Sequence, residues 1–115
     1  GTAPVYEGAQ LVDGIDGASY GGDDPTASSG TLRYVRIWYG GGIIGADNEI
    51  NGLTLAGVGS GTAIDHVEVA YSLDDGVELD GGTANLKHVS VLFVGDDALD
   101  VDLGYQGKLQ FLYVM

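Results

Sequence analysis

The most informative absences in this chain are those of cysteine, positive charge and long apolar runs. Its 115 residues contain no cysteine, which excludes disulfide bonds and thiolate metal sites. Only four lysine or arginine residues stand against 17 aspartate or glutamate residues, giving a formal net charge of −13. Binding phosphate needs clustered basic side chains, so this charge argues against nucleic acid and anionic membranes as partners. No apolar run approaches membrane-spanning length, so we expect no membrane insertion by this segment.

The residues that are present indicate a folded domain. Very acidic chains are often disordered, but 44% hydrophobic residues and regular alternation of Val, Ile, Leu and Tyr oppose that interpretation. The 21 glycines do not follow a collagen period, and they suit a fold whose chain turns often. No helical pattern of useful length is visible. The composition therefore predicts one all-β domain.

A strand-like phrase recurs along the chain and carries most of the fold prediction. It occupies residues 32–39, returns at 64–71 and 86–93, and is cut off at 109–115. Strands that return every 20 to 30 residues or so indicate a solenoid, in which each coil buries its apolar edge against the next. Alignment places Val35, Val67, Val89 and Leu112 in one inward column, and Ile37, Val69, Val91 and Val114 in another.

A second, shorter strand repeats at 53–55, 77–79 and 99–101. Together the two strands predict a right-handed parallel β-helix of about four to five coils. We expect residues 29–115 to form the coils and residues 1–28 to be a loop-rich part of an earlier coil. The segment 40–45 lengthens the first coil and should protrude. The phrase interrupted at Met115 suggests a piece of a longer polypeptide, whose open helix ends could self-associate.

Acidic turns are the first candidate site. Asp74, Asp75, Asp96 and Asp97 should fall on two adjacent coils, where like charges repel unless a hard cation relieves them. Calcium takes six to eight oxygen ligands, so these carboxylates predict a calcium site. The alternative is that aspartate is there to form turns by bonding its own backbone.

Aromatic and histidine side chains give two further candidates. Trp38 and Tyr39 could stack on a carbohydrate, or Trp38 could pack beneath the 40–45 loop. Outward columns also place flat side chains one above another, and a histidine pair one coil apart could bind a transition metal or simply form an aromatic stack. That column consists of Tyr34, His66, His88 and Phe111. A neighbouring column of alternating charge, Arg33, Asp65 and Lys87, predicts a ladder of ion pairs.

Several phrases also resemble a known family. Residues 29–37, 48–55, 57–62, 72–76 and 104–111 resemble secreted bacterial right-handed parallel β-helix surface proteins. That resemblance implies the fold and a secreted or cell-surface location. A wider resemblance is to pectin-lyase-like enzymes, because Gly95-Asp-Asp-Ala98 looks like the Gly-Asp-Asp motif of polygalacturonases. The Gly-His-Gly and Arg-Ile-Lys motifs of those enzymes are missing.

Three functions follow as hypotheses. The first is a non-enzymatic structural, adhesive or glycan-contacting module of a secreted or cell-surface protein, stabilised by calcium. The second is part of a polysaccharide-degrading β-helix enzyme. The third is a self-assembling extracellular element.

Overall fold

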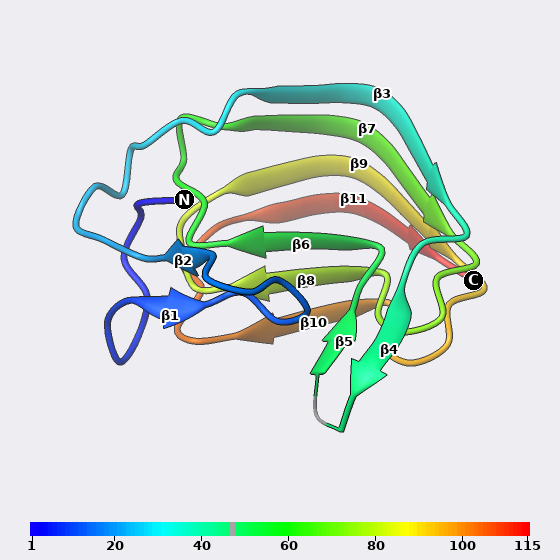
Figure 1. Ribbon diagram of the computed structural model, residues 1–115. Coiled ribbons are helices and arrows are strands. Elements are labelled where there is room, and N and C mark those ends of the chain that lie inside the picture. The colour runs from blue at the N-terminus through cyan, green and yellow to red at the C-terminus, as the bar shows by residue number, and fades with distance from the viewer. Residues whose placement is uncertain (47) are drawn as a thin grey trace.

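The chain folds into two parallel sheets that face each other across one core (Figure 1). The computed structural model describes residues 1–46 and 48–115. The described residues form strands and turns but no helix, which confirms the all-β prediction. The strands are β1 (Gln10–Leu11), β2 (Ser19–Tyr20), β3 (Thr31–Trp38), β4 (Gly42–Gly45), β5 (Asn48–Ile50), β6 (Leu53–Ala56), β7 (Ala63–Ala70), β8 (Val77–Asp80), β9 (Asn85–Leu92), β10 (Leu99–Asp102) and β11 (Leu109–Val114).

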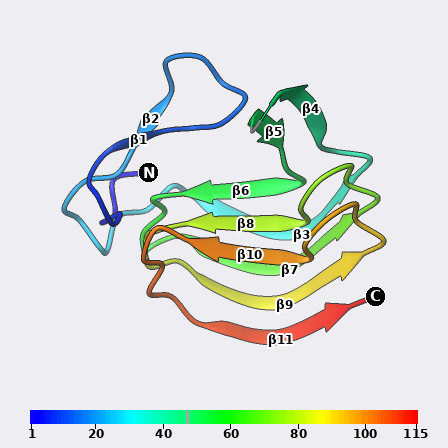
Figure 2. The same ribbon diagram turned by 90° about the horizontal axis from the view of Figure 1, so that it is seen from below.

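The recurring phrase forms the long sheet, ordered β11-β9-β7-β3, and the shorter repeat forms the second sheet, ordered β10-β8-β6. Every pair in both sheets is parallel, and sequence neighbours alternate between the sheets. Each passage from the long sheet to the short one and back therefore completes a coil. Figure 2 shows the two sheets from below, with the coils stacked one beside the next. The architecture is the predicted parallel β-helix.

The core lies between the sheets and is built from the predicted inward columns. Val77 and Leu79 of β8 are 0% exposed, as is Val69 of β7. Fully burying one such side chain stabilises the fold by about 1.5–3 kcal/mol. On β11, which has one neighbouring strand, the corresponding Leu112 and Val114 are 40% and 57% exposed.

Each long strand is bent by one residue in the left-handed backbone region. Tyr34 has a φ of 55°, and His66, His88 and Phe111 share this conformation on the next three strands. The bend shifts the alternation by one, so that Ile64 and Val67, three positions apart, both lie in the core. Left-handed backbone costs a non-glycine residue about 1–3 kcal/mol. Ring stacking between successive coils, worth about 0.5–1.5 kcal/mol per pair, offsets that cost.

The N-terminal 30 residues cross the glycine-rich ends of the coils. The amides of Ala3 and Tyr6 donate to the carbonyls of Gly57 and Leu103, and Gly82 donates to the carbonyl of Pro4. Within this segment Gln10–Leu11 pairs antiparallel with Ser19–Tyr20. The segment thus forms a small hairpin that lies against the coils.

The predicted protruding loop is a second antiparallel hairpin, β4–β5. It lies beside the N-terminal segment, because the amide of Gly14 donates to Asn48 Oδ1 at 2.5 Å. Both hairpins are on the β6 side of the coils (Figure 2). They flank the outer face of the short sheet at its β6 end.

Candidate functional site

Two surfaces bring chemically useful side chains together, and each lies on the outer face of one sheet. The first is an acidic cleft of about 300 Å³ beside the short sheet. The β4–β5 hairpin and the N-terminal segment contribute Glu49 and Asp13 to its wall. The remaining lining residues come from the coils: Asn51, Asp74, Asp75, Glu78 and Asp96.

Glu78 is the most perturbed carboxyl group in the acidic cleft. It lies on β8 between Thr54 of β6 and Asp100 of β10. Asn51 Nδ2 donates to Glu78 Oε2 at 2.6 Å, and the Thr54 hydroxyl donates to the same oxygen at 3.2 Å. Burial, followed by the negative charge of Asp80, raises the pKa of Glu78 to about 7. Part of the Glu78 population is therefore protonated at neutral pH.

Three of the four carboxylates predicted from the acidic turns come together. One oxygen of each of Asp74, Asp75 and Asp96 lies within 4.8 Å of the others. The side chain of Asp97 is exposed and belongs to neither acidic group found among the described residues. Its backbone amide instead donates to Asp75 Oδ1 at 2.9 Å, a hydrogen bond that joins two adjacent coils.

The acidic cleft also holds an unpaired acceptor. Asn51 is 8% exposed, and its Oδ1 has no hydrogen-bond partner among the described residues. A second group of close carboxylates, Asp75, Glu78 and Asp100, shares Asp75 with the first. Burial raises the pKa of Asp75. Close carboxylates supply the oxygen donors that hard divalent cations prefer.

The second surface is on the long sheet and is called the aromatic groove here. It is an open hollow of about 760 Å³ lined by Tyr34, Arg36, His66, Glu68, His88 and Phe111, with Val35, Val67 and Ser90. The predicted ring column is present. Successive ring centroids are 4.7, 4.5 and 4.8 Å apart from Tyr34 to Phe111. Because each ring covers its neighbour, the inner rings present mainly edges to solvent.

Trp38 and Tyr39 lie at the end of β3, beyond the aromatic groove. Trp38 is 49% exposed, so about half of its surface is open to solvent. Its Nε1 donates to Glu68 Oε1 at 2.9 Å, and the Arg36 guanidinium lies 5.7 Å from the ring centroid. Tyr39 is 75% exposed and stacks on Tyr71 at 5.2 Å, while Tyr71 stacks on Phe93. Both predicted ligand-binding residues are thus accessible.

Asp65 is a site residue that sequence reasoning assigned to another role. Its register between Arg33 and Lys87 is as predicted. The expected ion pairs do not form within the described part of the chain, where Asp65 pairs with His66 and His88 instead. The hydrogen bond with His88 is the main cause that lowers the pKa of Asp65. One ion pair between adjacent coils does form on this sheet, between Arg36 Nε and Glu68 Oε1, which are 3.5 Å apart.

Comparison with known proteins supplies the family. A family model described as a pectate-lyase like beta helix domain matches residues 1–115. The chain belongs to this pectate-lyase-like β-helix family. No curated protein and no solved structure matches it. The described residues contain no helix that is long and apolar enough to cross a membrane. Membership in the family agrees with the fold described above. It does not specify an activity for this β-helix.

Proposed function

We propose that this β-helix domain is a non-enzymatic, glycan-contacting module of a secreted or cell-surface protein, with calcium bound in its acidic cleft. One observation carries the glycan proposal. Tyr34, Trp38 and Tyr39 are 79%, 49% and 75% exposed on the same coil. Folded domains seldom expose large aromatic side chains together unless the surface binds something. Tyr34 and Tyr39 begin their stacked columns, so each keeps a ring face that no other described ring covers.

The negative charge of the domain indicates which class of glycan it would bind. The formal net charge of −13 repels polyanions. Beside the exposed rings, Arg36 is paired with Glu68 and adds no net positive charge. Neutral polysaccharides, whose apolar sugar faces pack on aromatic rings, therefore fit this surface better than uronic acid polymers.

Retardation in gels that contain neutral polysaccharides tests the glycan proposal. Removing one ring should weaken binding about 3- to 10-fold, since an aromatic contact is worth about 0.5–1.5 kcal/mol. Tyr39→Ala is the test variant. Tyr6→Ala is the matched control, because Tyr6 is 70% exposed but lies in the N-terminal segment. Equal retardation of the two variants, or none for any neutral glycan with the wild type, would contradict the proposal.

Calcium binding rests on the acidic cleft. Asp74, Asp75 and Asp96 supply carboxylate oxygens from two adjacent coils, and Asn51 lines the same cleft from a third coil. A bound cation would relieve the repulsion between these carboxylates and tie neighbouring coils together. The domain should therefore melt at a higher temperature in calcium than in chelator.

Two adjacent aspartates, Asp96 and Asp97, allow a controlled test of the calcium site. Asp96 belongs to the close carboxylate group, whereas the side chain of Asp97 does not. Asp96→Asn should abolish most of the calcium-dependent rise in Tm, while Asp97→Asn, with the same charge change, should retain it. An unchanged wild-type Tm at millimolar calcium would contradict calcium binding. Equal losses in both variants would indicate a general charge effect instead.

A second candidate function is polysaccharide cleavage, favoured by one feature. With its pKa raised to about 7, Glu78 could donate a proton at neutral pH, as the general acid of a glycosidase does. Asp75 and Asp100 would stand beside it as carboxylate partners. Release of reducing ends that Glu78→Gln abolishes would favour the enzyme. Absence of products from a polysaccharide that the domain retains in gels would favour the binding module.

A further inference from the structure

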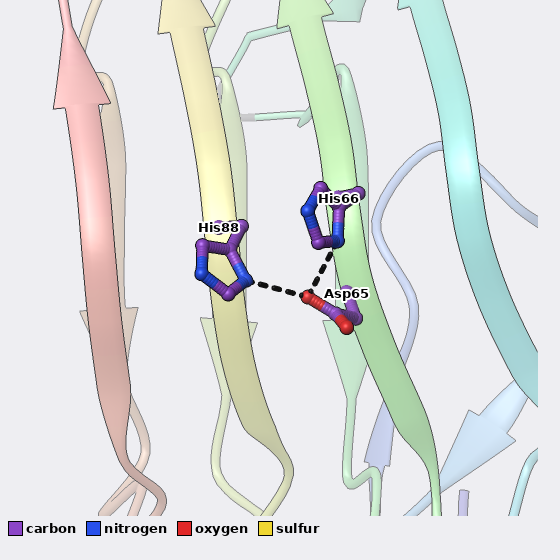
Figure 3. Close-up of polar contacts among 3 residues, drawn as sticks. All are labelled: Asp65, His66 and His88. Carbon is purple, nitrogen blue, oxygen red and sulfur yellow. Dashed lines mark hydrogen bonds and ion pairs between the residues drawn. The ribbon is translucent and has the colours of Figure 1, made fainter.

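We propose that Asp65, His66 and His88 form a site for a divalent transition-metal ion, separate from the acidic cleft and next to the Tyr34 ring of the glycan surface. Figure 3 shows the two imidazoles on adjacent strands, β7 and β9, both directed at one carboxylate. Asp65 Oδ1 lies 2.9 Å from the Nδ1 atoms of His66 and His88. The three donor atoms lie within 4.8 Å of one another.

The three donor atoms are close enough for one ion to contact all of them after small side-chain movements. Both 2.9 Å separations are hydrogen-bond distances in the ion-free protein, and metal–nitrogen and metal–oxygen bonds of about 2.0–2.2 Å would replace those contacts. Imidazole nitrogens suit Zn²⁺, Ni²⁺ and Cu²⁺, and Cu²⁺ binds such donors most tightly among the divalent first-row metals. The donor types therefore favour Cu²⁺ as the ion to test.

The neighbouring charges show that the arrangement is specific. Arg33 and Lys87 occupy the register positions on either side of Asp65. Asp65 nevertheless pairs with the two imidazoles, and the Lys87 ammonium lies over the Phe111 ring at 5.5 Å. The carboxylate is thus held toward the nitrogen donors and away from the cations that could neutralise it.

Exposure leaves room for additional ligands. The side chains of His66, His88 and Asp65 are 43%, 40% and 33% exposed, so water can complete the coordination. The two nitrogen donors distinguish this site from the acidic cleft, whose all-oxygen donors suit calcium. A bound ion would add a link between β7 and β9, which already meet through the sheet ladder, ring stacking and the Asp65–His88 contact.

Binding of Cu²⁺ to the purified domain, followed by titration calorimetry and electron paramagnetic resonance, tests the site. His88→Phe removes a ligand but keeps a flat ring, since Phe111 occupies the next position of the same column with the same left-handed backbone. We expect one Cu²⁺ per wild-type chain with nitrogen hyperfine splitting. His88→Phe and Asp65→Asn should each weaken binding about tenfold or more. Their Tm in chelator should stay close to that of the wild type.

Asp96→Asn in the acidic cleft is the control for adventitious binding to an acidic protein. It should leave the affinity and the nitrogen signal unchanged. A Cu²⁺ spectrum without nitrogen splitting would overturn the proposal. So would an affinity that falls with Asp96→Asn and not with His88→Phe.

Discussion

Replacing Glu78 by glutamine should stabilise the ion-free protein at alkaline pH. Glu78 is partly buried and is held by Asn51 and Thr54, both of which donate to Oε2. Glutamine keeps an oxygen that accepts these hydrogen bonds but removes the desolvated charge. It also removes the repulsion from Asp80 and Asp75. The variant should therefore gain stability wherever wild-type Glu78 is ionised.

The magnitude follows from the raised pKa. Burial raises the pKa of Glu78 from 4.5 to about 7, so the folded state holds the proton more tightly than the unfolded state. Below about pH 4.5 both states are protonated and the group costs nothing. As pH rises to about 7 the folded state loses up to about 3 kcal/mol, which solvent screening reduces to about 1–2 kcal/mol. For a domain of this size that is roughly 5–10 °C in Tm.

Urea unfolding of both proteins at pH 4.5 and pH 8, in chelator, measures the effect. The wild type and Glu78→Gln should be equally stable at pH 4.5 and should differ by about 1–2 kcal/mol at pH 8. Glu49→Gln is the charge-matched control in the same cleft, and its effect should be smaller. A Glu78→Gln variant that is no more stable than the wild type at pH 8 would refute the reasoning.

Two further variants test the packing of the coils by urea denaturation. Leu79→Ala should cost about 2–5 kcal/mol because Leu79 is 0% exposed, while Leu73→Ala, at a side chain 71% exposed, should change stability by less than about 0.5 kcal/mol. Gly76→Ala should cost about 1–3 kcal/mol, since a Cβ there would collide with Val91 Cγ1 and approach the Ala98 carbonyl oxygen to 2.7 Å. Near-neutral results for Leu79→Ala or Gly76→Ala would contradict the coil stacking.

The fold was predictable because the apolar pattern is repeated. One strand of alternating residues is ambiguous, but columns such as Val35, Val67 and Val89 fix both face and register, and the structure has that register. The bend in each long strand was not predicted, although the pattern of outward residues indicates it. Arg33 and Arg36 are both outward yet three positions apart, which strict alternation does not allow. The left-handed residue between them, Tyr34, resolves the conflict.

The sites were predictable only in part. Neighbouring coils set which turns meet, so the proximity of Asp74, Asp75 and Asp96 followed from alignment. Glu49 and Asp13 come from the two hairpins, whose positions depend on tertiary contacts that no repeat specifies. The partners of Asp65 depend on side-chain rotamers. From register alone, Arg33 and Lys87 were as well placed to pair with Asp65 as His66 and His88.

The most direct test of the glycan-contacting role is the fluorescence of Trp38, the single tryptophan of the chain, during titration with neutral oligosaccharides. The ring is 49% exposed beside Tyr39, so a sugar that covers it should shift the emission to shorter wavelength in a saturable manner. Tyr39→Ala should weaken that response about 3- to 10-fold, and Tyr6→Ala should leave it unchanged. An emission spectrum that no neutral glycan alters would contradict the role proposed for this surface.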